Sequence, residues 1–578
     1  MIIKQPWWKE VVVYQIYVRS FKDTDQDGIG DLPGILGSIP YLKQLGVDAI
    51  YLNPINKSPN DDFGYDISDF YGIMDEFGTL ADFDELIRTL HDHGIRFIMD
   101  LVINHSSDEH PWFKEARTSR DNPFHDFYIW RDGKAGGPPN NWPSFFGGSA
   151  WAYNEATDEY YLHLFSRKQP DFNFTNDQLI DHIKNILRFW IDRGVDGFRF
   201  DAINHIAKDL EFPDGPMKPG DRYGDFIPFV QNLPKVHDYI RELRRDAITL
   251  PDFFVAGEAG GIGFENAHLY TAQDSNELDV LFHFDMHSIG RGPQDWLRIP
   301  VDLRKTIKRS FTGWATRPDT EGWNPVFYSN HDTTRTVSRI GDDAHYREAS
   351  AKALALLQLT QRGTPFIYYG DEIGMTNAWD FKLTDYRDIA VFQKYEEQVV
   401  NGIVSPGDYL TGLHYLNRDN ARTPMQWNSQ PGAGFSTATP WIPLNQNYQT
   451  INVEAELQTP DSIFHFYQTM IHLRRVHPVL IHGSLTEYLP HHEQIYVYTR
   501  QGEVESTEYL ILLNLTSKPA QAELPIDLTN RLDPPVVALM LSNYPNRPPL
   551  ESVISLLPWE ARLYAIKSLK EEDPSSTV

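Results

Sequence analysis

The sequence predicts an α/β protein built on a (β/α)₈ barrel, with an inserted subdomain after the third strand and a C-terminal antiparallel β domain. Short apolar runs alternate with amphipathic segments over the first 370 or so residues, roughly as a barrel requires. Continuously apolar strands separated by helices are typical of a parallel sheet covered on both faces. After about residue 480 the chain changes to strand-like segments alone, which predicts the separate β domain.

Seven apolar segments of strand length predict strands of the barrel. They span residues 11–17, 47–52, 95–100, 197–201, 253–258, 326–330 and 365–369. Helices are predicted between the first three strands, over 36–45 and 83–93, because each periodic segment ends at a glycine, Gly46 or Gly94.

Two long segments interrupt the alternation. Residues 105–173 are rich in Gly, Pro, Asn, Trp and Phe and are too long for an ordinary βα loop, so they predict an inserted subdomain B. Residues 376–455 form an extended excursion between the last strand and a helix near 461–477. The predicted barrel therefore comprises 1–104 and 174–479, and residues 480–578 form a C-terminal β-sandwich domain.

Composition excludes several classes of function. The 80 acidic and 52 basic residues give a net charge of −28, opposite in sign to the field that a nucleic-acid-binding surface needs. The absence of cysteine excludes disulfides, thiolate metal sites and a cysteine nucleophile. No signal-like segment follows the N-terminus and no run of about 18 apolar residues occurs, so we expect a cytoplasmic protein with no membrane contact.

Carboxylates stand at the ends of four predicted strands, where a parallel barrel places its active groups. These residues are Asp100, Asp201, Glu258 and Asp332, and Arg199 lies two residues before Asp201. Any one of them could simply cap a helix, but four at one edge of a barrel indicate chemistry. Paired carboxylates suit cleavage of a glycosidic bond, in which one attacks while ionised and another donates a proton. A carboxylate metal cluster is the weaker alternative, because Arg199 would repel a divalent cation.

The motifs around these residues resemble the α-amylase superfamily, glycoside hydrolase family 13. Four segments are similar to its conserved regions: DLVINH (100–105), GFRFD (197–201), GE (257–258) and NHD (330–332). QPDFN (169–173) is similar to the family's additional motif in the inserted domain. GYDI (64–67) and RDNARTPMQW (418–427) resemble the oligo-1,6-glucosidase and α-glucosidase subgroup, which also includes dextran glucosidases and sucrose isomerases.

The resemblance implies a role for each carboxylate. Asp201 would be the nucleophile, Glu258 the general acid/base, and Asp332 the third carboxylate, which holds and distorts the sugar as the transition state forms. The family acts by double displacement with retention of the α-configuration. Arg199, two residues before the nucleophile on the same strand face, would keep Asp201 ionised.

The same resemblance implies a pocket for one terminal glucose. Asp66 and Arg418 would grip its far hydroxyls, Tyr65 would stack on the ring, and His105 and His331 would hydrogen-bond it. For Tyr65 alone, ordinary packing is an equally good interpretation. Three further candidates come from the insertion, where burial in the subdomain's own core is the alternative: Phe146, Phe165 and Gln169.

The segment DTDQDGIGD (23–31) suggests a cation loop. Oxygen ligands at alternate positions, with a glycine for the sharp turn, suit a hard cation, although a solvated acidic turn is the simpler interpretation. Gly34 stands at the twelfth position, so the segment is not a complete EF-hand. Because the subgroup carries a calcium loop here, the resemblance implies structural Ca²⁺ and no organic cofactor. Its ligands would be Asp23, Asp25, Asp27, Asp31 and the backbone carbonyl of Ile29.

The residues beside the predicted catalytic carboxylates bear on substrate preference. In the subgroup the residue after the nucleophile is Val in α-1,6 enzymes and Thr in α-1,4 enzymes, but here it is Ala202. Small residues also follow Glu258, and Thr333-Thr334 replaces the usual Gln-Pro. We expect an exo-acting, retaining α-glucosidase that acts on short oligosaccharides, with a lean to α-1,4 substrates such as maltose and with possible transglucosylation.

The same motifs also fit three other functions. One is an α-1,6-specific oligo-1,6-glucosidase or dextran glucosidase. Another is a sucrose isomerase or sucrose-active glucosyltransferase, and the remotest is an inactive sugar-binding relative. The expected partner is a small oligosaccharide, and the chain is expected to be a monomer or a weak dimer.

Overall fold

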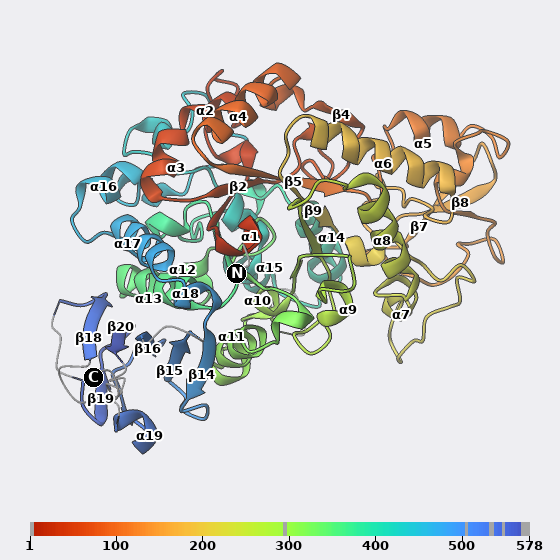
Figure 1. Ribbon diagram of the computed structural model, residues 1–578. Helices are drawn as coiled ribbons and strands as arrows, with labels where there is room; N and C mark the ends of the chain where they lie inside the picture. The colour runs from red at the N-terminus through yellow and green to blue at the C-terminus, as the bar shows by residue number, and fades with distance from the viewer. Residues whose placement is uncertain (1–4, 293–296, 503–506, 531–536, 546–549, 568–578) are drawn as a thin grey trace, which may run out of the picture.

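The computed structural model describes residues 5–292, 297–502, 507–530, 537–545 and 550–567. Its centre is a parallel sheet of eight strands in the order β11-β10-β9-β5-β2-β1-β13-β12 (Figure 1). A bridge between Val280 and Trp323 joins the two ends of the sheet, which curls into the predicted barrel. The strands are β1 (Val13–Ile16), β2 (Ala49–Leu52), β5 (Arg96–Val102), β9 (Gly197–Asp201), β10 (Phe254–Glu258), β11 (Val280–Phe282), β12 (Pro325–Val326) and β13 (Thr364–Tyr368).

The apolar segments correctly predict six of these barrel strands, and β1, β2 and β9 are buried along their whole length. Burial on both sides of the strand explains why their sequences lack the alternation of a half-exposed sheet. The strand predicted over 326–330 overlaps the two-residue β12 only at Val326. The sequence missed β11, because its three residues are too few to form a recognisable apolar run.

Helices cover the outside of the barrel, the longer ones being α4 (Leu80–Asp92), α6 (Asp177–Asp192), α8 (Lys235–Ala247), α13 (Arg347–Thr360) and α17 (Ile463–Val476). The single helix predicted over 36–45 is wrong: α2 (Leu32–Gly37) and α3 (Ile39–Leu45) are separate. The break lies at Ser38, whose Oγ donates to the Gly34 carbonyl (2.7 Å), and Pro40 lacks an N–H. Gly46 ends α3 in the left-handed conformation, as predicted.

The insertion after β5 contains α5 (Pro111–Ala116) and a small antiparallel sheet of β6 (Trp130–Arg131), β8 (Glu159–Leu162) and β7 (Trp151–Asn154). It extends to one side of the barrel (Figure 1). Its apolar core also includes Phe212, Phe226 and Val230 from the segment after β9. Lys208, in the segment after β9, joins that segment to the insertion. Its Nζ contacts Asp171 Oδ1 (2.7 Å) and Asn104 Oδ1 (2.9 Å).

The excursion after β13 carries short helices and the second half of the site. It comprises α14 (Ile389–Tyr395), a π-helical turn (Glu396–Val400), α15 (Pro406–Leu416), a 3₁₀ segment (Arg418–Arg422) and α16 (Val453–Gln458). The described helices contain no segment long and apolar enough to cross a bilayer.

The C-terminal part forms two antiparallel sheets beside the barrel (Figure 1). The larger contains β14 (Ser484–Tyr488), β15 (Ile495–Gln501), β16 (Thr507–Asn514), β20 (Ala561–Lys567) and β18 (Val537–Ser542), and the smaller contains β17 (Ala520–Glu523) and β19 (Val553–Leu556). Alternate residues of β15 face opposite ways: Val497 packs toward the small sheet, whereas Tyr496 and Tyr498 join the barrel core. Residues 568–578 of the predicted domain lie outside the described residues.

Candidate active site

A cavity of about 650 Å³ opens at the carboxyl ends of the barrel strands. The predicted site residues that line it are Tyr65, His105, Phe146, Phe165, Gln169, Asp201, Glu258, Asp332 and Arg418. Asp66, Arg199 and His331 are buried but do not line it. The strand ends therefore bring residues together that lie hundreds of positions apart in the sequence.

One arginine joins three of the strand-end carboxylates. Nη1 of Arg199 donates to Asp100 Oδ1 (2.8 Å) and Asp201 Oδ1 (2.7 Å). Nη2 of Arg199 lies 2.9 Å from Glu258 Oε2. Because Asp201 and Glu258 contact the two ends of one guanidinium, the predicted catalytic pair faces the same part of the cavity.

Burial sets the electrostatics of this group. Burial raises the pKa of Asp201 well above its ordinary value; Arg199 opposes this, and the charges of Glu258 and Asp100 add to it. Arg199 is therefore the shared counter-charge of three carboxylates, and the repulsion among these carboxylates adds to the effect of burial on Asp201.

The residue after Asp201 has an uncommon backbone. Ala202 is left-handed (φ 45°, ψ 34°), a conformation that costs a non-glycine residue about 1 kcal/mol. This turn directs the Ala202 N–H to Glu258 Oε2 (3.3 Å). The end of β9 therefore helps to orient the carboxylate at the end of β10.

Asp332 is held by three partners. Its Oδ1 accepts from Arg418 Nη1 (2.9 Å) and Arg422 Nη2 (3.1 Å), and its Oδ2 lies 2.9 Å from His331 Nε2. Burial alone would raise the pKa of Asp332, but His331, Arg418 and Arg422 outweigh it and hold that pKa well below its usual range. Asp332 is therefore ionised.

The prediction that Asp66 grips the substrate is wrong. Its carboxylate accepts from Ser58 Oγ (2.8 Å) and from the backbone N–H groups of Asp61 (2.9 Å) and Asp62 (3.0 Å), and it is fully buried. Asp66 thus holds the loop that presents Asp62. Left-handed backbone at Phe63 (φ 49°) reverses the chain between the two aspartates.

Asp62 occupies the position expected of Asp66. It lines the cavity, and its carboxylate accepts from Arg418 Nη2 (3.2 Å) and Gln169 Nε2 (3.2 Å). Arg418 Nη2 also donates to Asp388 Oδ1 (2.9 Å). Burial raises the pKa of Asp62 to about 6, although Arg418 opposes the rise.

His331 lies behind Tyr65 and does not reach the cavity, so it cannot bind the sugar as predicted. The two rings stack at 5.2 Å and 9°. Nδ1 of His331 faces the Asn53 amide nitrogen (2.9 Å), which donates to it, so Nε2 carries the proton toward Asp332. The Tyr65 hydroxyl donates to Asp100 Oδ2 (2.9 Å).

The insertion supplies one wall of the cavity, as predicted. Burial lowers the pKa of His105 to about 4, so the imidazole is neutral, and Nδ1 accepts from the Asn104 amide (3.1 Å). Phe165 packs 5.3 Å from the His105 ring. Phe146 lies under the Arg418 guanidinium, 5.6 Å from its centre.

Sequence reasoning missed four residues of the site: Asp62, His205, Asp388 and Arg422. Asp62 lies four residues before Asp66, so the motif pointed to the right loop and the wrong carboxylate. His205 lines the cavity, and its Nδ1 donates to the Val230 carbonyl (2.9 Å), which leaves Nε2 as an acceptor. Asp388 comes from the excursion, where no periodic pattern places a side chain.

The outer part of the cavity is lined by smaller groups. Gly260 and Gly261 follow the acid/base candidate, and Gly261 is left-handed (φ 74°). A Cβ on Gly261 would lie 2.6 Å from Gln231 Oε1, so the amide of Gln231 packs directly against it. Phe284, 37% exposed, completes this side.

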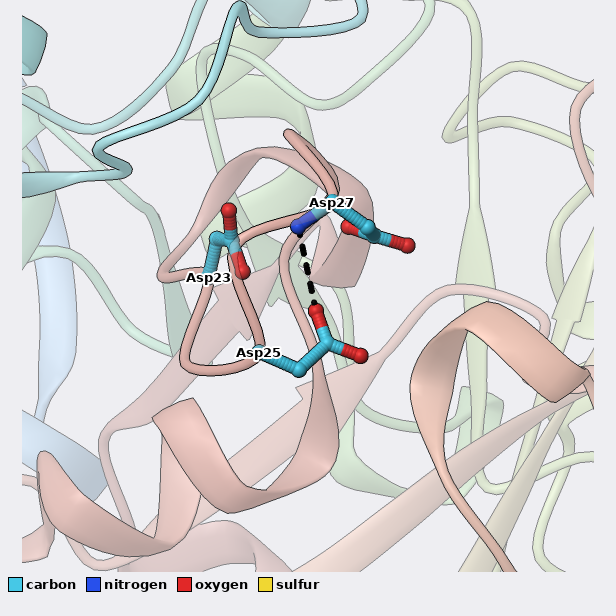
Figure 2. A group of neighbouring side chains, drawn as sticks. All are labelled: Asp23, Asp25 and Asp27. Atoms are coloured by element: carbon cyan, nitrogen blue, oxygen red, sulfur yellow. Dashed lines mark hydrogen bonds between the residues drawn. The ribbon is translucent and has the colours of Figure 1, made fainter.

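Three aspartates of the predicted cation loop gather at one point. Asp23, Asp25 and Asp27 each place one carboxylate oxygen within 4.8 Å of the others (Figure 2). This donor set fits a hard cation such as Ca²⁺. Asp31 does not join them, because it caps α2 through the Gly34 N–H (2.6 Å) and also accepts from the Thr24 N–H (2.7 Å).

Comparison with known proteins agrees with this geometry. Residues 15–483 match the family model for the catalytic domain of alpha amylase. The chain belongs to the alpha-amylase family. This alpha-amylase-family protein is therefore a glycoside hydrolase.

Known proteins are similar to this chain over almost its whole length. An oligo-1,6-glucosidase from Parageobacillus thermoglucosidasius is 45% identical over 567 residues, which cover 98% of this chain and 100% of the relative. The crystal structure of Bacillus licheniformis trehalose-6-phosphate hydrolase is similar with a TM-score of 0.90 and 39% identity, covering 98% of this chain and 100% of that one. The crystal structure of trehalulose synthase from Pseudomonas mesoacidophila MX-45 is similar with a TM-score of 0.89 and 41% identity, covering 98% of this chain and 100% of that one.

Proposed function

We propose that this enzyme is an exo-acting α-glucosidase that releases terminal glucose from short oligosaccharides with retention of configuration. The observation that carries the proposal is a charged cluster in the cavity, which we call its inner end, where Arg418 contacts Asp62, Asp332 and Asp388 at 2.9–3.2 Å. Charged groups that converge on one point would hydrogen-bond the far hydroxyls of one terminal sugar. A longer chain could then extend only toward the opening.

The inner end is also covered. Phe146 of the insertion lies against Arg418 of the excursion, 5.6 Å from the centre of its guanidinium. The next residue, Gly147, is so close to the excursion that a Cβ there would lie 3.2 Å from Glu397 Oε1. Because the two inserted segments meet here, a terminal sugar fits and an internal one does not.

The chemistry follows from the carboxylates. Asp201 would attack the anomeric carbon while Glu258 donates its proton to the glycosidic oxygen, so the bond to the leaving sugar breaks and a glucosyl-enzyme ester forms. Water would then attack the same carbon as Glu258 takes its proton and Asp201 leaves. Two inversions return α-glucose. Ionised Asp332 would stabilise the positive charge that develops on the sugar.

For the linkage we propose α-1,4, as in maltose. Ala202 has no β-branch beside the scissile bond, and Gly260 and Gly261 keep the leaving-group side open. The name of the oligo-1,6-glucosidase relative favours a second candidate, α-1,6 linkages as in isomaltose. The similarity to trehalulose synthase makes sucrose the third substrate to test.

Three measurements test the function. Proton NMR of maltose hydrolysis should show α-glucose before mutarotation, and β-glucose as first product would contradict the retaining mechanism. Values of kcat/KM on maltose, isomaltose, sucrose and maltotriose, with product chromatography, should rank maltose first. The Asp201→Ala variant should lose roughly 10⁴-fold or more of the activity, whereas equal turnover by the variant and the wild type would place the activity elsewhere.

We also propose that Asp23, Asp25 and Asp27, with the Ile29 carbonyl, hold Ca²⁺ in a structural role. Asp23 binds the excursion directly, through the Ser436 hydroxyl and through its own N–H to the Phe435 carbonyl (3.0 Å). A cation would neutralise three neighbouring carboxylates at this junction. The cytoplasmic location and the monomeric or weakly dimeric state stay predictions.

A further inference from the structure

Two buried arginines connect the segment that carries Asp332 with the segment that carries Arg418. Arg335, on the first segment, donates to the carbonyls of Tyr369 (Nη1, 2.6 Å) and Asn420 (Nε, 3.3 Å). Arg422, on the second, donates from Nε to the His331 carbonyl (2.9 Å). Their exposures are 0% and 1%. Each segment therefore binds the backbone of the other.

Of these two arginines, Arg422 alone also touches a carboxylate of the site. Its Nη2 donates to Asp332 Oδ1 (3.1 Å), while its Nε holds the carbonyl of the preceding residue. One planar group thus fixes both the side chain of Asp332 and the peptide bond that leads to it. Rotation of the carboxylate would break this contact.

The two arginines on Asp332 occupy different sides of it. Arg418 lines the cavity and is partly exposed there, with 15% of its side chain accessible. Arg422 does not line the cavity, and its side chain packs under the ring of Tyr17, 5.6 Å from the ring centre. A bound sugar can therefore contact Arg418 and cannot contact Arg422.

We propose that Arg422 is a positioning residue, which fixes the Asp332 carboxylate from the protein side while Arg418 serves the sugar. The proposal rests on the proposed function, because it needs Asp332 to act on the sugar. A carboxylate held from behind keeps its orientation while the sugar changes shape toward the transition state. Losing that support should therefore cost more in the transition state than in substrate binding.

The surroundings of Arg422 require a guanidinium. Its Nη1 lies 3.7 Å from Asp419 Oδ1, and Asp419 Oδ2 accepts the N–H groups of Arg387 (2.7 Å) and Asp388 (2.9 Å). Lysine keeps the positive charge, but one ammonium cannot reach the His331 carbonyl and the Asp332 carboxylate in the same fixed geometry. Charge and geometry can therefore be separated by substitution.

The experiment compares Arg422→Gln, Arg422→Lys and the matched control Arg335→Gln. Arg335 is equally buried and joins the same segments, but it touches no carboxylate of the site. We expect Arg422→Gln to lower kcat by roughly 100-fold with KM within about threefold, and Arg422→Lys to lower it by about tenfold. Arg335→Gln should lower the melting temperature as much while kcat stays within roughly fivefold.

A second readout separates orientation from general damage. The inhibition constant of the cationic iminosugar 1-deoxynojirimycin should rise in parallel with the loss of kcat in the Arg422 variants, whereas that of glucose should change little. If Arg422→Gln does not fold, the kcat of Arg422→Lys and its inhibition constant for 1-deoxynojirimycin provide the same test. A kcat within threefold of wild type in the folded Arg422 variant (about 0.7 kcal/mol), or an equal kcat loss in Arg335→Gln, would overturn the proposal. A wild type without α-glucosidase activity would instead refute the proposed function.

Discussion

The inner and outer ends of the cavity are built in opposite ways. At the inner end, Arg418 and Asp332 have charged partners at about 3 Å that come from several elements of the fold. At the outer end, Ala202, Gly260 and Gly261 contribute almost no side chain. The inner end is therefore a network of charged side chains, whereas the outer end constrains a ligand mainly through the shape of its surface.

This difference separates two properties of the enzyme. A buried network in which each charge depends on its neighbours tolerates little change, so substitutions at the inner end should lower the activity on every substrate. The outer end is lined by small residues and by Phe284, whose side chains do not depend on one another for charge neutralisation. Linkage and acceptor choice should therefore change by substitution at the outer end without loss of the reaction.

Among the substitutions that compare the two ends, the largest effect is expected at Glu258, the acid/base candidate. The Glu258→Gln variant should lose roughly 10³-fold of kcat/KM on maltose, because the leaving sugar then departs without a proton. With p-nitrophenyl α-glucoside the loss should be smaller, since nitrophenolate leaves without one. Steady-state kinetics on both substrates measures the contrast, and equal losses on the two would argue against the acid role.

Substitution of Arg418 tests the inner end. Arg418→Gln removes the partner of Asp62, Asp332 and Asp388, and should lower kcat/KM by roughly 100-fold on every substrate alike. Arg418→Lys, which keeps the charge, should recover part of the loss. An effect confined to one linkage would show that the inner end also selects the leaving sugar. The proposed division of roles between the inner and outer ends would then be wrong.

Asp62 gives the inner end a pH dependence. Its pKa of about 6 means that the carboxylate is ionised above pH 6 and becomes protonated as the pH falls below it. A protonated Asp62 accepts hydrogen bonds less well, so KM should rise by up to tenfold for each pH unit below about 6. KM measured from pH 5 to 7.5 checks this, and the Asp62→Asn variant should give a high KM that does not change with pH.

Ala202→Val tests the outer end. The added methyl groups should lower kcat/KM on maltose relative to isomaltose by roughly tenfold, while total turnover survives. The left-handed backbone at this position resists a β-branched residue, so the variant should also be about 1–2 kcal/mol less stable. Thermal denaturation separates the two effects. An unchanged maltose-to-isomaltose ratio would show that this position does not select the linkage.

The smallest effect on activity is expected from the cation loop, which touches neither end. Chelation with EGTA should lower the melting temperature by a few degrees, and added Ca²⁺ should restore it, because a ligand that binds only the folded state stabilises it. Asp25→Ala, on the exposed side of the loop, should remove this response and leave kcat nearly unchanged, because it deletes one oxygen ligand. A melting temperature insensitive to EGTA and Ca²⁺ would refute the proposed site.

The sequence predicts the reaction centre better than the pocket around it, for a physical reason. Asp201 and Glu258 terminate strands, and a parallel barrel directs every strand end to one face. Side chains from loops have no such rule. The turn at Phe63 lies between Asp62, which lines the cavity, and Asp66, which does not, and no pattern in the sequence fixes that turn.

The remaining misses have similar causes. The three residues of β11 are too short for a periodic signal, although they complete the barrel between β10 and β12. Arg422 stands within a motif that the resemblance singled out, but its partner Asp332 is 90 residues away in the sequence. Such contacts arise from tertiary packing, which composition and spacing do not encode.

Lys208 bears on how the inserted subdomain is kept in place. Its ammonium group lies between Asp171 and Asn104, at the base of the wall that carries Gln169. This positive charge is covalently attached, so it cannot dissociate, be diluted or be extracted by a chelator. The alignment of the substrate wall with the barrel should therefore be independent of the ionic composition of the medium, even where the stability of the loop at Asp23 follows it.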